Sequence, residues 1–535
     1  MTRRHWTLTA LVACGALGAA AFGPAAPSQR LPTPARTVAS TSRTFVYDTL
    51  YATIEAPWDP AIVYNAAAIP LSEMYQTLTY YNAATKKLTP ELATSWSSSN
   101  HGTIWTFNLR HGVKFHTGRL MTAQAVKAAI ERTVALKGGA AYIWDSVSSI
   151  DTPTPYTLVF HQKYSFALDL ATSSAYGAFI YDTNADGAGN LANWFDSGHD
   201  SGTGPYTVKS LNPGQAIAVV LKKFPQYWGG WSGSHYTQVV FEVTPNENTA
   251  VQLAESHQVT FVQALTPQLW GKFKGLKGFE TPSYTSWVNL FTFYNTAYGP
   301  FANLDFRKAV SEAIDYKGIL GAEGGGDIRT PGVIPPTFVG YDPNLPEYKT
   351  NLKQAKAFLA KSDMAGKSVT LSLTYNTGDT VEATAAVIIK SDLAKLGITV
   401  NIRALSTAAQ VSMATSPNPA NRQDMSLYYW WADYADPYSY VGSLFGTQNP
   451  PSYNWSGLSN KNLDSQIGRV ESVLGTSTAK AALLYEQMQR ELFQLDPGVV
   501  LLDLRYEYLF TAPVKGYVDN AAYAGVVLAY QLTPP

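Results

Sequence analysis

Strand-like and helix-like segments alternate along almost the whole chain after residue 43, and this alternation is the strongest constraint on its fold. Apolar and polar residues alternate as in a strand at Ile104–Leu109. Thr122 can cap a helix over 123–135, because its hydroxyl can accept from a first-turn amide. Around 369–404 a strand, a helix and a second strand follow one another, which predicts a parallel βαβ unit. The order of segments therefore predicts an α/β fold with mixed sheets.

Further segments follow the same two periodicities. Apolar spacing predicts a single helix from Asn303 to Ile319. The remaining expected helices cover 351–361, 380–396 and 478–494, and the remaining expected strands cover Tyr156–Phe160, 216–221, 238–243, Val369–Tyr375 and Thr399–Ala404.

The N-terminus has the features of an export signal. Arg3 and Arg4 precede an apolar run over residues 8–22, and small residues follow. This order is typical of a secretory signal peptide, which we assign to residues 1–21. Residues 22–42 hold four prolines among Ala, Ser and Thr and are interpreted as a linker. We therefore expect an extracytoplasmic protein, in the periplasm or at the cell surface.

The only cysteine of the chain lies inside this apolar run. The string Leu11-Val-Ala-Cys14 resembles a bacterial lipobox, in which Cys14 would be lipidated and would anchor the protein to the membrane. The alternative is ordinary cleavage near Ala21, because Cys14 comes early and apolar residues continue after it. Either route leaves the folded part without disulfides, so its stability has to come from its core.

Charge and length exclude some classes of function. The 535 residues carry 39 basic and 39 acidic side chains, so the formal net charge is zero. We expect no nucleic-acid partner, because a phosphate backbone needs a basic surface. No stretch after residue 25 is apolar for about 18 residues or more, so no later membrane span is predicted. The 33 Tyr and 13 Trp residues suit a ligand cleft, but equally a tyrosine-rich surface.

Five segments, in this order, carry a resemblance to a known family. They are Leu88–Trp96 with Trp105–Gly118 and Leu120–Val126, Gly202–Tyr206 with Pro225–Gly229, Phe301–Val310 with Ala313–Asp315, Trp430–Pro437, and Asn454–Asn460 with Leu463–Asp464. The chain thereby resembles the extracytoplasmic solute-binding proteins of family 5, the oligopeptide-, dipeptide- and nickel-binding components of bacterial ABC importers. It departs from the family pattern at Leu253–Val259, which lacks the usual Gly and Asp, and at Asp496–Leu502, which matches loosely.

The resemblance implies a two-lobed periplasmic-binding-protein fold of class II, of the large peptide-binding type with an extra subdomain. It assigns lobe I to 43–75, 200–290 and 500–535, the inserted subdomain to 76–199, and lobe II to 291–499. Two crossing strands would form the hinge. The ligand would bind between lobes that close around it, and a membrane permease would recognise the closed form. We expect a monomer. Because it would make and break no covalent bond, the resemblance implies no enzyme activity, cofactor or metal.

The segment Trp430-Trp-Ala-Asp-Tyr434 is the candidate binding site. A cleft that accepts peptides of different sequence has to bind groups that all peptides share. A buried carboxylate suits the α-ammonium, because a charge-assisted hydrogen bond is strong where water is excluded. In peptide-binding members of the family the aspartate of this motif binds the ligand's α-amine, which implies that role for Asp433. Trp430, Trp431 and Tyr434 would wall the site. The alternative is that Asp433 caps a turn and Trp430 fills a core.

Other ligands stay open at this point. An oligosaccharide could stack on aromatic side chains, for which the candidates are Tyr428, Tyr429, Trp430, Trp431 and Tyr438. A nickel chelate is a third class of ligand, although eight His and no cysteine in the folded part disfavour direct ligation by the protein. A surface receptor for a peptide signal would use the same fold.

Three further features are expected to be structural. Arg110 and His116 lie on a strand and its turn, with no second histidine at metal-ligand spacing. Asp182-Thr-Asn-Ala-Asp-Gly187 resembles the start of a calcium loop, but Asn193 stands where a bidentate Glu is needed, so an Asx-rich turn is expected. The motifs of serine hydrolases, zinc proteases and phosphate-binding loops are absent from the sequence.

Overall fold

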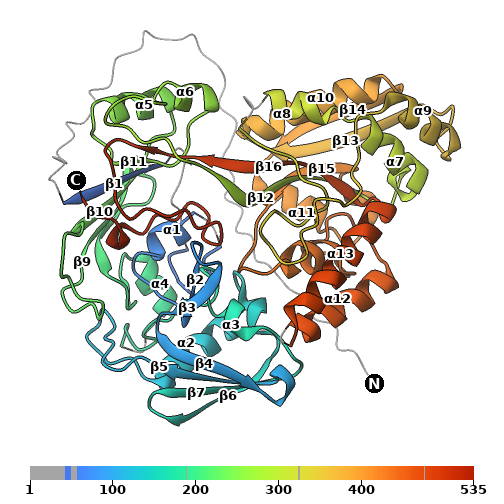
Figure 1. Cartoon of the computed structure of the whole chain (residues 1–535). Coiled ribbons are helices and arrows are strands. Elements are labelled where there is room, and N and C mark those ends of the chain that lie inside the picture. Colours follow the sequence, from blue (N-terminus) through green and yellow to red (C-terminus); the bar gives the residue numbers. More distant parts are fainter. Residues whose placement is uncertain are drawn as a thin grey trace. The chain divides into compact units, whose positions relative to one another are not determined.

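The computed structural model describes residues 43–49, 57–64, 66–187, 189–322, 326–474 and 476–534. The predicted signal peptide, the predicted linker and Cys14 lie outside these residues. Two large sheets and two smaller sheets organise the described chain (Figure 1).

The first large sheet has six strands and draws on three separate parts of the chain. Its order is β17 (Leu509–Phe510), β11 (Phe261–Val262), β1 (Thr44–Thr49), β10 (Gln238–Val243), β9 (Ile217–Lys223) and β8 (Tyr206–Leu211). β1 runs parallel to both of its neighbours, whereas the other pairs are antiparallel. The sheet is therefore mixed, as the sequence predicts.

The chain between β1 and β8 forms smaller sheets of its own. Four antiparallel strands follow the order β4 (Ala93–Ser99), β5 (Ile104–Leu109), β7 (Thr157–Gln162) and β6 (Val147–Thr154), and β2 (Thr79–Asn82) pairs with β3 (Lys87–Pro90). Helix α2 (Ala123–Leu136) begins where the sequence predicts, because the Thr122 hydroxyl accepts from the amide of Ala125 at 3.3 Å. Both the predicted strand at 104–109 and this helix are confirmed.

The second large sheet has five strands, in the order β14 (Ile398–Leu405), β13 (Val369–Asn376), β15 (Met425–Trp430), β12 (Ser283–Tyr294) and β16 (Gly498–Glu507). β13 pairs with β14 in parallel, and α10 (Thr380–Ala394) connects them, so the predicted βαβ unit is confirmed. Buried apolar residues of β13, β15 and α10, among them Leu371, Leu427 and Ile389, form its core.

Two adjacent strands connect the large sheets. β12 carries the chain away from the six-stranded sheet, and β16 brings it back to β17 (Figure 1). The two strands are antiparallel and paired from Ser283 with Glu507 to Phe293 with Gly498. The pairing is interrupted between Thr285 and Asn289, where the register shifts.

The helix predicted from Asn303 to Ile319 is in fact two helices, α7 (Leu304–Ala313) and α8 (Tyr316–Ala322). Ile314 between them has extended backbone angles, with φ of −62° and ψ of 130°. The amide of Asp315 then donates to Asp392 on α10 at 2.7 Å, and the Asp315 carboxylate accepts from the amide of Gly318 at 3.0 Å. The prediction was wrong because a hydrogen bond to a distant helix, and a new cap, replace the bonds of a continuous helix.

The remaining described helices lie around these sheets. They are α1 (Ala68–Leu71), α3 (Leu168–Ala171), α4 (Leu191–Asp196), α5 (Glu247–Glu255), α6 (Pro267–Gly271), α9 (Leu352–Lys361), α11 (Thr407–Ala414), α12 (Lys461–Leu474) and α13 (Thr478–Leu495). Within the ranges that the structure describes, no helix is both long and apolar enough to cross a bilayer.

Candidate ligand-binding site

The candidate site lies in the turn that follows β15, a central strand of the five-stranded sheet. Asp436 organises this turn, because its carboxylate accepts from the amide of Tyr438 at 2.7 Å and from the hydroxyl of Tyr485 at 2.9 Å. Trp430 at the end of the strand donates its indole N–H to the carbonyl oxygen of Ser439 at 3.0 Å. Asp436 therefore holds the turn, which leaves the Asp433 carboxylate free for other contacts.

The carboxylate of Asp433 is buried and contacts residues from a distant part of the chain. Its exposed fraction is 1%. The hydroxyl of Tyr64 donates to Oδ1 at 2.8 Å, and the hydroxyl of Tyr142 donates to Oδ2. The backbone carbonyl oxygen of Asp433 accepts from Ser174 Oγ at 2.6 Å. The turn after β15 is thus tied to three residues that precede β8 in the chain.

The charge of Asp433 has no cationic partner among the described residues. None of their ion pairs includes it. Burial raises the pKa of Asp433 to about 6, although the hydrogen bonds from Tyr142 and Tyr64 act in the opposite direction. At neutral pH the site therefore presents a buried, ionised carboxylate that is held only by neutral donors.

Aromatic rings surround this carboxylate. The Tyr64 ring lies 5.2 Å from Tyr176 and 6.1 Å from Trp431, centroid to centroid. Trp431 in turn lies 6.4 Å from Trp430, which packs edge-on against Tyr453 at 5.3 Å. The π faces of such rings favour a cation placed close to them.

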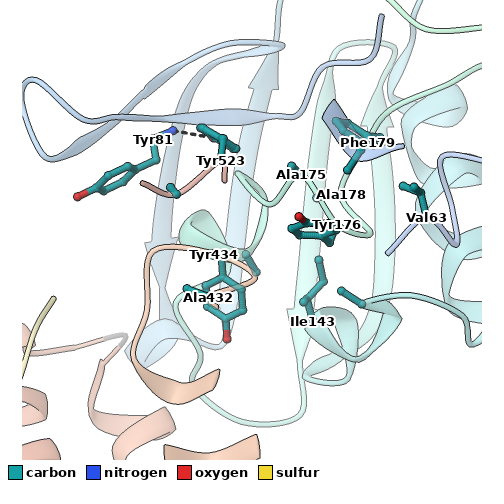
Figure 2. Close-up of a cluster of buried hydrophobic side chains, with 14 of the residues drawn as sticks. Val63, Tyr81, Ile143, Ala175, Tyr176, Ala178, Phe179, Ala432, Tyr434 and Tyr523 are labelled. Atoms are coloured by element: carbon teal, nitrogen blue, oxygen red, sulfur yellow. Dashed lines mark hydrogen bonds between the residues drawn. The ribbon is translucent and has the colours of Figure 1, made fainter. Parts of the chain in front are cut away.

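The four predicted site residues have different surroundings. Trp430 and Tyr434 are buried, at 6% and 3% exposure, and Tyr434 packs edge-on against Phe166 at 6.2 Å. Figure 2 draws Ala432 and Tyr434 in one buried cluster with Ile143, Ala175 and Tyr176. Asp433 carries a buried carboxylate without a cationic partner among the described residues, and the Trp431 indole N–H has no hydrogen-bond partner among them.

Sequence reasoning missed Tyr64, Tyr142 and Ser174. They lie 369, 291 and 259 residues before Asp433 in the chain. The abundance of tyrosine was the only sequence signal related to them, and it does not single out positions. The segment that carries Tyr64 is held by Asp59, whose backbone carbonyl accepts from the amides of Ile62 and Val63, both at 3.1 Å.

Arg110 and His116 have the structural surroundings that the sequence predicts. Arg110 donates to the carbonyl oxygen of Glu91 at 3.1 Å, and its guanidinium lies 4.1 Å from the Trp228 ring centroid. His116 binds the Asp200 carboxylate through Nδ1 and the Gly204 carbonyl oxygen through Nε2.

The loop that resembles the start of a calcium site is an Asx turn. The Asp182 carboxylate accepts from the amide of Asn184 at 3.0 Å and pairs with Arg119 at 2.7 Å. Among the described residues, no group of three or more His, Cys, Asp or Glu side chains is arranged to hold a metal ion.

Comparison with known proteins agrees with this architecture. The family pattern described as bacterial extracellular solute-binding proteins, family 5 Middle, matches residues 87–452. The chain is 27% identical to the probable D,D-dipeptide-binding periplasmic protein DdpA of Escherichia coli, over 83% of this chain and 86% of that protein. It is 24% identical to di/tripeptide-binding protein 2 of Pseudomonas aeruginosa, over 86% of this chain and 90% of that protein.

A solved structure supports the fold. The periplasmic binding protein DppA of Helicobacter pylori, in complex with the peptide STSA, has a TM-score of 0.79 and 22% identity, over 92% of this chain and 99% of that chain. The expected two-lobed α/β fold of periplasmic binding proteins is thereby confirmed. With a family pattern that spans most of its length, the chain belongs to family 5 of the bacterial extracellular solute-binding proteins.

Proposed function

We propose that this protein is the solute-binding component of an ATP-driven importer, and that it captures short peptides with a free α-amino group outside the cytoplasm. The observation that carries the proposal is the Asp433 carboxylate, which is 1% exposed and has no cation among the described residues. A buried charge without a counter-charge is unfavourable, and a ligand ammonium would supply the missing charge. The names of the two relatives above, for dipeptides and di/tripeptides, support peptides as the ligand.

The contacts of Asp433 also support binding between two lobes. Asp433 follows a strand of the five-stranded sheet, whereas Tyr64, Tyr142 and Ser174 precede the strand β8 of the six-stranded sheet. In this proposal the lobes comprise 43–75, 200–290 and 500–535 on one side and 291–499 on the other, with 76–199 as the inserted subdomain. The crossing strands β12 and β16 act as the hinge, and the ligand favours the closed state by its better fit there.

A panel of small ligands tests the proposal directly. Isothermal titration of the purified protein with di-L-alanine, di-D-alanine and tri-L-alanine should give saturable binding for at least one peptide. N-acetylation of that peptide should abolish most of the affinity. Saturable binding of an oligosaccharide or a nickel chelate, with none for any peptide, would contradict the proposed ligand class.

Peptide binding should depend on pH through Asp433. The pKa of about 6 means that the carboxylate gains a proton as the pH falls through this value, and the protonated form cannot pair with an ammonium. The peptide's own α-ammonium stays protonated over this range, since its pKa is about 8. We expect affinity to fall roughly tenfold between pH 7 and pH 5, measured by titration calorimetry.

The control for this pH dependence is Asp433→Asn. The tyrosines that face Asp433 have pKa values raised by burial and stay neutral between pH 5 and 7. Asp436 also has a pKa of about 6, so a pH dependence that persists in Asp433→Asn would assign the titration to Asp436 or another group.

Export is proposed from the sequence of residues 1–21. N-terminal analysis of the mature protein should find the chain starting after this segment, in an extracytoplasmic fraction. If Cys14 is lipidated, the protein should be in the membrane fraction and Cys14→Ala should release it. Recovery from the cytoplasm with Met1 retained would contradict export itself.

A further inference from the structure

Two neighbouring tryptophans in the candidate site, Trp430 and Trp431, differ in the hydrogen bonding of their indole N–H groups. Trp430 Nε1 donates to the carbonyl oxygen of Ser439 at 3.0 Å. Trp431 Nε1 is shielded from solvent, yet it donates to no acceptor among the described residues. Buried donors in native proteins nearly always have an acceptor, and leaving one unpaired costs free energy. The Trp431 N–H therefore needs a partner that the described chain does not provide.

The position of Trp431 indicates where that partner comes from. Its ring lies 6.1 Å from the ring of Tyr64, whose hydroxyl donates to Asp433. Trp431 is also only two residues before Asp433 in the chain. The rest of the indole is partly exposed, whereas its Nε1 is not. Solvent is thus excluded from the N–H itself, and the Tyr64 ring beside the indole belongs to a donor of the carboxylate that is proposed to bind the ligand.

We propose that the indole N–H of Trp431 is a specificity-determining donor, which binds the carbonyl oxygen of the ligand's first residue. The inference rests on the proposed function, because Asp433 has to hold the α-ammonium. In any peptide the first carbonyl oxygen is three bonds from the ammonium nitrogen. A ligand held by Asp433 therefore brings an acceptor to the ring beside it. The preferred ligand class is then the α-aminoacyl group, with ammonium and carbonyl on one carbon, and not a simple amine.

The energetic reason for this selectivity is the unpaired donor. An amine without a carbonyl would satisfy Asp433 and leave the N–H of Trp431 buried and unpaired, whereas a peptide satisfies both groups. Sites built around buried hydrogen-bonding groups reject analogues that lack the matching group much more strongly than sites built around apolar contacts.

The test is a cycle of two changes, one in the protein and one in the ligand. Trp431→Phe keeps an aromatic ring and removes the N–H. The ligand is the tightest binder among di-L-alanine, di-D-alanine and tri-L-alanine, together with its trans-alkene analogue, in which –CH=CH– replaces the first –CO–NH–. We expect Trp431→Phe to weaken binding of the parent peptide roughly five- to tenfold, and to change binding of the alkene analogue hardly at all. An equal effect of Trp431→Phe on both ligands would overturn the inference.

Trp430→Phe is the matched control, since it makes the same change of size one residue earlier. It leaves the Ser439 carbonyl without its donor, so the ligand-free protein should lose more thermal stability than Trp431→Phe does. Trp431→Phe removes a donor that has no partner among the described residues of the ligand-free protein. If Trp431→Phe costs as much stability as Trp430→Phe and leaves affinity unchanged, Trp431 is structural and the inference is wrong.

The outcomes separate this inference from the proposed function. N-acetylation could abolish binding while replacement of the first amide by the alkene weakens binding equally in the wild type and in Trp431→Phe. In that case the role proposed for Trp431 is wrong and the role of Asp433 stands. If no peptide of the panel binds the wild-type protein, both are wrong.

Discussion

Replacement of Asp433 by alanine should weaken peptide binding by roughly 100- to 1,000-fold or more while the protein stays folded. The Asp433 carboxylate is 1% exposed, so it lies where water is excluded, whereas the Asp436 carboxylate of the same turn accepts from the Tyr438 amide and the Tyr485 hydroxyl. Losing one partner of a buried charge pair typically costs about 3–5 kcal/mol, and each 1.4 kcal/mol is about tenfold in affinity. Titration calorimetry at pH 7 with the tightest peptide of the panel measures the effect.

A change in the ligand distinguishes the α-amine role from a packing effect. N-acetylation of the peptide should weaken binding to the wild type about as much as Asp433→Ala does, and should weaken binding to the mutant far less. Asp433→Asn is the matched control of size, because it keeps the shape and removes the charge. If free and acetylated peptides bind the wild type equally, Asp433 does not hold an α-amine, and the role proposed for Asp433 is wrong.

Replacement of Arg132 by methionine should lower the free energy of unfolding by about 3–5 kcal/mol. Arg132 on α2 binds both carboxylate oxygens of Asp59, Oδ1 at 2.8 Å, and Asp59 is fully buried. Methionine preserves the length of the aliphatic stem and leaves the buried Asp59 charge unpaired. Urea denaturation of the ligand-free protein, analysed as a two-state transition, measures the loss.

The same helix provides the control. Lys127 pairs with Glu131 at 3.7 Å, but Glu131 is 57% exposed, so Lys127→Met should cost less than about 1 kcal/mol. A further variant, Asp59→Asn combined with Arg132→Met, should recover part of the loss because no charge is then left unpaired. Equal losses for Lys127→Met and Arg132→Met would show that the Asp59 pair contributes no more than a surface pair.

The Asp59 pair also bears on the site. Asp59 organises the turn that leads to Tyr64, because its carboxylate accepts from the amide of Ala61 at 3.0 Å. Tyr64 then donates to Asp433. We therefore expect the Arg132 change to disturb a donor to the candidate carboxylate as well as the stability of the fold.

Much of the fold could be predicted from the sequence, because the relevant forces act between residues that are close in the chain. The strand at 104–109 follows from alternating polarity, and the helix after Thr122 follows from a local cap. The parallel unit at 369–404 follows from a β-α-β order that permits few arrangements. Family membership was also predictable, since it depends on ordered sequence motifs.

Other features depended on contacts between distant residues, and only the tertiary structure decided them. The break at Ile314 results from the bond between the Asp315 amide and Asp392, 77 residues away. The sequence singled out Asp433 but not its donors Tyr64 and Tyr142, because one tyrosine resembles another until folding brings two of them to a carboxylate. The adjacent Trp430 and Trp431 are chemically identical in sequence. They differ because the chain turns back to offer the Ser439 carbonyl to the Trp430 indole N–H, while the described chain offers no acceptor to that of Trp431.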